Sequence, residues 1–187
     1  MCNWLFNFIS HKQLIRPANY PEGVVGNGYG IYECQGKKIG VINLIGRVDI
    51  NILSENPFLT VEKIIEKIKN ETDLIIVDFH AEATAEKRSM GYYLDGRVTA
   101  VLGTHTHVQT ADAQILPEGT AYITDVGMTG PKESVLGIEP RLAIKKMKYH
   151  IPVRFQNAEG RYVMNACLID IDEKTGKATC IKRVVLK

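Results

Sequence analysis

Apolar residues occur along the chain in two patterns, and each pattern predicts one kind of element. Continuous apolar runs at 74–79, 98–102 and 121–126 are typical of strands that are buried on both faces. Between the helix-capping residue Thr60 and the first of these strands, isoleucines recur at helical spacing within 62–69, with charged residues between them. The middle of the chain therefore predicts strands that alternate with helices.

The two ends of the chain predict hairpins. The remaining expected elements are helices at 84–94 and 141–149, a first hairpin of 30–34 and 39–44, and a second hairpin of 162–172 and 178–186. Two prolines keep 16–23 in an extended loop. Together these elements predict an α/β sandwich with mixed sheets, whose chemically interesting residues lie at the carboxyl ends of strands.

Three of the five histidines follow directly on predicted strands. His80 ends the strand 74–79, and His105 and His107 follow the strand 98–102. In an extended backbone His105 and His107 point to the same side, roughly 6–7 Å apart. A single histidine at a strand end is more often a hydrogen-bonded structural residue, but three in two short motifs favour a metal site.

Polar neighbours of these histidines offer supporting contacts. Asp78 shares a strand face with His80, so it is either a metal ligand or an acceptor that orients an imidazole. Glu82 is a weaker candidate, and for both carboxylates the capping of the following helix is an equal alternative. Thr104 could supply a further hydrogen bond. The two other histidines, His11 and His150, are expected to be structural.

Glycines near the predicted strand ends could lie against a ligand. Gly103 would allow close backbone approach to an ion or a phosphate. The turn of Gly127, Met128 and Thr129 could lie over a substrate in the same way, although an ordinary turn is the commoner meaning of such a sequence.

Length and composition limit the classes of function. The 187 residues suit a single domain spanning 1–187. A net charge of +2 gives no basic stripe and argues against a groove that binds nucleic acid. Small anionic substrates remain possible, because a metal ion would supply positive charge locally. No apolar run reaches the ~18–20 residues of a membrane span.

Cysteines and the first residues bear on the compartment. The cysteines are widely separated, form no Cys-x-x-Cys pair, and are expected to be buried small residues of a reducing cytoplasm: Cys2, Cys34, Cys167 and Cys180. The apolar segment 1–9 lacks a positively charged start and a small-residue cleavage site, which predicts a helix and a cytoplasmic protein.

At the level of whole motifs the chain resembles the YmdB-like family of metallophosphoesterases. The resemblance runs from about Phe6 to the C-terminus, and the segments that carry it are 16–19, 78–84, 95–97, 103–112, 121–131 and 152–155. It implies an αββα sandwich and a centre of two divalent ions, Fe, Mn or Zn. It also implies metal-hydroxide attack on a small phosphodiester, such as a 2′,3′- or 3′,5′-cyclic nucleotide. By the same resemblance His80, His105 and His107 are metal ligands.

The chain departs from the family pattern at its beginning. That pattern begins with a strand that ends in a metal-binding aspartate, followed by a Glu-Asn pair and then an Asn-His pair. The match to this sequence begins just after the Asn-His pair. The expectation is therefore a domain that is truncated at its N-terminus, lacks its first strands and exposes a sheet edge, with no residue assigned to catalysis. A complementing N-terminal fragment or a homo-oligomer would be its partner. The alternative is a non-catalytic remnant that acts as a metal-binding or interaction module.

Overall fold

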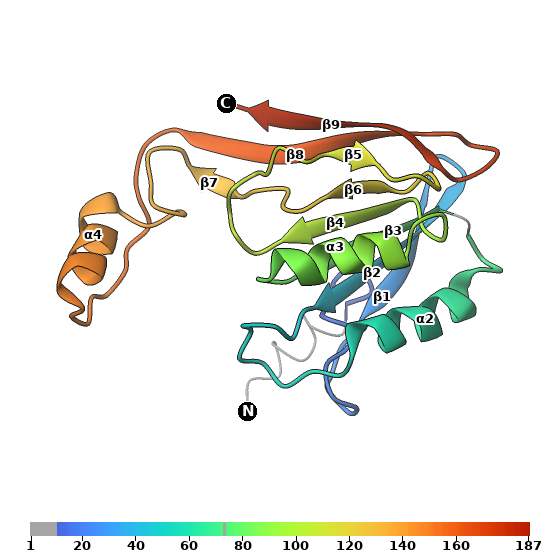
Figure 1. The fold of residues 1–187 in the computed structure, drawn as a ribbon, viewed down its shortest axis with the longest axis horizontal. Coiled ribbons are helices and arrows are strands. Elements are labelled where there is room, and N and C mark those ends of the chain that lie inside the picture. The colour runs from blue at the N-terminus through green and yellow to red at the C-terminus, as the bar shows by residue number, and fades with distance from the viewer. Residues whose placement is uncertain (1–10, 73) are drawn as a thin grey trace.

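The computed structural model describes residues 11–72 and 74–187, which form two packed sheets and three helices (Figure 1). The first sheet has the order β1-β2-β3-β4-β6-β5. Its strands are β1 (Tyr29–Cys34), β2 (Lys37–Ile45), β3 (Leu74–His80), β4 (Ala100–Thr104), β6 (Ala121–Ile123) and β5 (Gln114–Ile115). The second sheet contains β7 (Thr129–Pro131), β8 (Tyr162–Ile171) and β9 (Ala178–Leu186). The helices are α2 (Pro57–Ile68), α3 (Thr84–Tyr93) and α4 (Pro140–Tyr149).

The central strands β2, β3, β4 and β6 are parallel, and the flanking strands β1 and β5 are antiparallel to their neighbours. Helix α2 connects β2 to β3, and α3 connects β3 to β4. Right-handed crossovers that advance in one direction across a sheet place their helices on the same face. Both helices accordingly cover one face of the first sheet (Figure 1).

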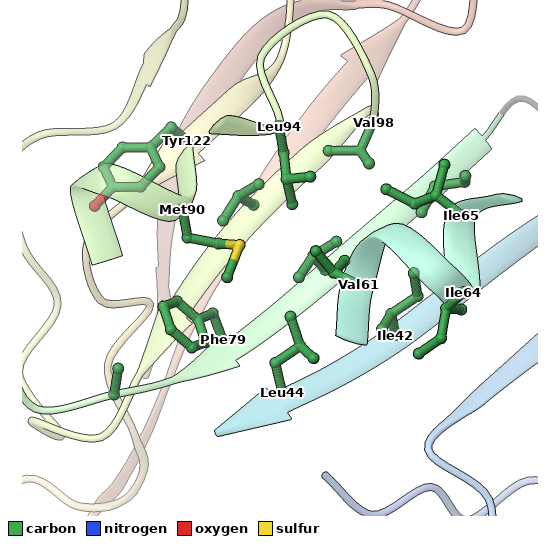
Figure 2. Close-up of a cluster of buried hydrophobic side chains, with 14 of the residues drawn as sticks. Ile42, Leu44, Val61, Ile64, Ile65, Phe79, Met90, Leu94, Val98 and Tyr122 are labelled. Atoms are coloured by element: carbon green, nitrogen blue, oxygen red, sulfur yellow. The ribbon is translucent and has the colours of Figure 1, made fainter. Parts of the chain in front are cut away.

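The main core lies between these two helices and the sheet (Figure 2). On β3 the side chains of Ile75, Val77 and Phe79 are buried in this core. Because strand side chains alternate, Asp78 and His80 point to the opposite face of the sheet. The strand thus carries core residues on one face and the candidate site residues on the other.

The three-stranded sheet lies along that opposite face (Figure 1). Small buried residues mark this contact, namely Ala100, Ala121 and Ala178, with larger partly buried side chains such as Ile76 and Leu102 around them. The layers are therefore helices, sheet and sheet, while α4 stands apart from them beyond one end of the strands (Figure 1). This arrangement confirms the predicted α/β class with mixed sheets.

Most predicted elements are confirmed, with two corrections to their limits. Helix α2 begins at Pro57, because Asn56 caps it by accepting a hydrogen bond from the backbone N–H of Phe58, so the prediction of Thr60 as the cap is wrong. The expected turn after β6 runs into a short strand, β7, which pairs with β8.

The expected burial of the cysteines is wrong where the structure describes them. Cys34 is exposed, and Cys167 and Cys180 are half-buried free thiols. Cys2 and the helix predicted in 1–9 lie outside the described residues. Among the residues that are described, no helix combines the length and the apolar character needed to cross a bilayer.

Candidate functional site

Register places the candidate residues of three parallel strands next to one another. Asn43 on β2 is the cross-strand partner of Asp78, and His80 is the partner of Thr104 on β4. All four side chains lie near the carboxyl ends of their strands, on the face turned away from the helices. The two strand-end motifs of the sequence are thus brought into direct contact.

A chain of hydrogen bonds connects these side chains. The Asn43 amide donates to Asp78 Oδ2 over 2.7 Å, and the Thr104 hydroxyl donates to Asp78 Oδ1 over 3.1 Å. Thr104 Oγ1 also lies 3.1 Å from His80 Nδ1. Since the hydroxyl proton is directed at Asp78, Thr104 accepts from His80, and the ring proton of His80 is on Nδ1. This places the lone pair of His80 on Nε2, the nitrogen that faces His105.

Burial shifts the pKa values in this chain. Burial raises the pKa of Asp78 above its ordinary value, although the hydrogen bonds from Thr104 and Asn43 oppose the rise. Burial and the neighbouring His105 lower the pKa of His80. A lowered pKa favours the neutral imidazole, which is the form that binds a metal ion.

His105 lies against His80 and Glu82. Its Nδ1 is 3.0 Å from His80 Nε2, and its Nε2 is 2.7 Å from Glu82 Oε2. The two rings meet edge to face, with their centroids 4.8 Å apart. Glu82 is therefore an orienting partner of His105 in this structure. The alternative sequence prediction, in which Glu82 caps the helix α3, is wrong, because that helix begins after Ala83 without a side-chain cap.

His107 does not join this pair. The expectation of an extended backbone through 105–107 is wrong, because the strand ends at Thr104 and both histidines have positive φ, 127° at His105 and 66° at His107. Non-glycine residues rarely adopt this conformation. As a result His107 Nδ1 lies 3.1 Å from the carbonyl oxygen of Leu136, on the connection that leads to α4.

Gly103 has a packing role that differs from the predicted one. A Cβ at this position would lie 1.8 Å from the carbonyl oxygen of Thr124 on the adjoining segment. The backbone of Thr124 therefore fills the space beside Gly103, where the sequence suggested an ion or a phosphate. The glycine allows β4 and the end of β6 to approach closely.

The predicted substrate loop follows the end of β6 and is fixed at both of its ends. The backbone N–H of Gly127, a residue with φ of 82°, donates to Asp125 Oδ1. The carbonyl of Met128 accepts from the Asn165 amide, and Thr129 enters β7. Asp125 also accepts from the backbone N–H of Thr106, so the loop lies beside the histidine segment. A role in substrate binding stays a prediction.

The histidine pair fits two ligands of one divalent ion. Two nitrogens bound to a tetrahedral ion at about 2.0–2.1 Å lie roughly 3.4 Å apart, close to the separation of His80 Nε2 and His105 Nδ1. Within 11–72 and 74–187 no group of three or more His, Cys, Asp or Glu side chains is arranged to hold a metal. The described residues therefore offer this pair, with Glu82 beside it, and leave His107 apart.

Sequence reasoning missed three residues that support the site: Asn43, Lys87 and Asp125. The Asn43 amide reaches Asp78 only because β2 pairs with β3, and Lys87 forms a buried ion pair with Asp125 across 38 positions of sequence. Neither residue stands out in its own segment. Only Asp125 carried a local indication, as a carboxylate that follows an apolar strand.

Comparisons with known proteins identify relatives of the chain. The chain is 50% identical over 183 residues to the 2′,3′-cyclic-nucleotide 2′-phosphodiesterase of Bacillus subtilis strain 168, and the match covers 97% of this chain and 69% of that protein. A crystal structure of a hypothetical protein from Thermus thermophilus superposes with a TM-score of 0.90 at 34% identity, covering 99% of this chain and 71% of that one. A novel phosphatase from Mycoplasma pneumoniae gives a TM-score of 0.88 at 36% identity, covering 97% and 66%.

These relatives are longer than the chain, which spans about two thirds of their length. The model of the family described as YmdB-like protein matches residues 3–184, nearly the whole sequence. The chain thus belongs to the YmdB-like protein family.

Proposed function

We propose that the chain acts as a metal-dependent phosphodiesterase on small cyclic nucleotides, with 2′,3′-cyclic nucleotides as its substrates. The observation that carries the proposal is the convergence of His80 and His105 from neighbouring parallel strands, with their nitrogens 3.0 Å apart. The 50% identity to a 2′,3′-cyclic-nucleotide 2′-phosphodiesterase supports the choice of substrate.

His80 and His105 would share one divalent ion, whereas His107, whose Nδ1 faces the Leu136 carbonyl, lies apart from that position. Such ions supply positive charge for a phosphoryl group and lower the pKa of a bound water. Imidazoles bind Fe, Mn and Zn, so the supply of each metal in the cell would decide which one occupies the site.

The residues around the imidazoles hold them in a form that binds metal. Thr104 and Asp78 keep the proton of His80 on Nδ1, and Glu82 orients His105 through Nε2. The loop of Gly127, Met128 and Thr129 would cover one side of the substrate. We assign no residue of 11–72 or 74–187 as a general acid.

The test combines metal content with turnover. The purified chain, loaded with Mn²⁺, should hydrolyse 2′,3′-cyclic AMP faster than 3′,5′-cyclic AMP. His105→Ala should abolish both metal binding and turnover, whereas His11→Ala, which removes an exposed imidazole on the loop before β1, should leave both unchanged. Turnover that survives in the His105→Ala protein would contradict the proposal.

A non-catalytic metal-binding module is the second candidate. The observation that favours it is that the described part of the chain brings together two imidazoles and one carboxylate, but no group of three or more donors arranged around one position. Stoichiometric metal without hydrolysis of either nucleotide, with binding lost in His105→Ala, would select this candidate over the first.

A further inference from the structure

We propose that Asp125, held by Lys87, is a positioning residue that fixes the histidine segment 105–107 against the loop 127–129. The inference deepens the proposed function, on which its metal readout rests, but the contacts that carry it join protein groups alone. It adds a buried ion pair to the residues that shape the site.

One carboxylate holds both segments. Asp125 Oδ2 accepts from the backbone N–H of Thr106 at 2.8 Å, and Oδ1 accepts from the backbone N–H of Gly127 at 2.9 Å. Thr106 lies between the two predicted metal ligands, and Gly127 begins the predicted substrate loop. The two oxygens of this side chain therefore bridge the two segments, beside the backbone hydrogen bond from the Val126 N–H to the Gly103 carbonyl.

The histidine segment needs such a restraint. His105 and His107 both have positive φ, an arrangement that costs free energy in non-glycine residues and persists only where surrounding contacts impose it. The hydrogen bond to Thr106 is the contact that holds the backbone between them. Loss of that bond would let the segment relax and would move His105 relative to His80.

Lys87 forms a buried ion pair with the carboxylate. Its Nζ lies 3.1 Å from Asp125 Oδ2, and the two residues are 1% and 0% exposed. Burial by itself would raise the pKa of Asp125, but the hydrogen bonds from Thr106, Gly127 and Lys87 outweigh it and lower the pKa. Lys87 lies on α3, so the pair connects the helix layer to the site.

Asparagine cannot replace this carboxylate. Its amide has one acceptor oxygen and one donor nitrogen, whereas Thr106, Gly127 and Lys87 all present donors. In Asp125→Asn one of the two backbone N–H groups must therefore face an NH₂ group and lose its hydrogen bond. The substitution changes no volume, so its effect separates hydrogen bonding from packing.

The test compares Asp125→Asn with Asp95→Asn in the full chain. Asp95 also accepts two backbone N–H bonds, one per oxygen, from Glu118 and Thr120, but at the other end of the first sheet. The readouts are amide hydrogen exchange of Thr106 and Gly127 without metal, and the Zn²⁺ dissociation constant. The double variant Lys87→Met, Asp125→Asn removes both buried charges together, and it replaces the single variant if that one does not fold.

We expect the exchange of Thr106 or Gly127 to accelerate at least about tenfold in Asp125→Asn or in the double variant. The Zn²⁺ dissociation constant should rise by about 10–100-fold, the range found when an orienting partner of a metal ligand is lost. Asp95→Asn should change neither. Unchanged exchange at both amides, or wild-type Zn²⁺ affinity in a variant whose exchange has accelerated, would overturn the inference. Failure of the wild-type chain to bind Zn²⁺ would refute the proposed function alone, because amide exchange still decides the positioning role.

Discussion

Replacement of Thr104 by valine tests the hydrogen-bond chain that sets the tautomer of His80. The Thr104 hydroxyl makes two contacts of 3.1 Å, one to Asp78 and one to His80. Valine keeps the shape of the side chain and suits a strand, so the backbone of β4 should be unaffected. Only the two hydrogen bonds are lost.

The structure gives the expected size of the effect. A hydrogen bond to a charged group contributes about 1.5–3 kcal/mol and a neutral one about 0.5–1.5 kcal/mol, and the half-buried position argues for the lower ends of both ranges. We therefore expect Thr104→Val to lower the free energy of unfolding by about 2 kcal/mol. For a chain of this size that corresponds to a fall in Tm of about 4–8 °C. Metal affinity should fall by about 10–100-fold, because the tautomer of His80 is no longer fixed.

Three measurements check the prediction: thermal unfolding, Zn²⁺ titration calorimetry, and ¹⁵N NMR of the histidine rings, which reports the protonated nitrogen directly. Thr104→Ser is the matched control, since it removes a methyl group and keeps the hydroxyl. The reasoning is refuted if Thr104→Val retains the Nδ1–H tautomer and wild-type Zn²⁺ affinity, or if Thr104→Ser loses affinity to the same extent.

Three further outcomes follow from packing and charge. Gly103→Ala should lower the free energy of unfolding, measured in urea, by about 3 kcal/mol, because its Cβ would lie 1.8 Å from the Thr124 carbonyl oxygen. Gly130→Ala is the control and should change this free energy little, because a Cβ there meets only Met128 atoms at 3.5 Å or more. Phe79→Ala, at a fully buried position on the helix face, should cost about 3–5 kcal/mol in the same assay, and a smaller loss would show that the core between the sheet and α2 and α3 is looser than described. Asp112 has a lowered pKa, because hydrogen bonds from Thr124 and Thr110 outweigh the effect of its burial. Its contribution to the free energy of unfolding is therefore present above its ordinary pKa of 3.8 and is lost as the pH falls through the lower pKa of the folded state. Asp112→Asn should therefore reduce stability at pH 7 and flatten its fall below about pH 4 in pH-dependent denaturation, and an unchanged acid profile would count against this assignment.

The elements of the fold were predictable where one strong pattern dominated. The apolar run 74–79 and the isoleucine spacing of 62–69 reflect burial, which depends mostly on local sequence periodicity. The start of α2 was missed although Asn56-Pro57 is a typical helix start, because Thr60 offered a second plausible cap.

The site was predictable only in part, because its geometry depends on pairing between distant segments. The position of His80 and His105 at strand ends follows from the sequence, but their contact requires the parallel register of β3 and β4. Lys87 lies between Glu86 and Arg88 and resembles an ordinary solvent-facing charge until α3 packs over the end of β6. The turn that separates His107 from His105 depends on positive φ values, which are uncommon outside glycine although histidine adopts them more often than most residues do.

The alternation along β3 has a consequence for how this protein can vary. Ile75, Val77 and Phe79 supply the core, while Asp78 and His80 supply the site, and the two sets interleave on seven residues of one strand. Insertion or deletion of a single residue within β3 would exchange the faces, burying a carboxylate and an imidazole beneath the helices and placing apolar side chains where Asp78 and His80 now lie. Stability and chemistry would fail together. Length changes should therefore be tolerated in the connections around this strand, for example between α2 and β3, and not within it.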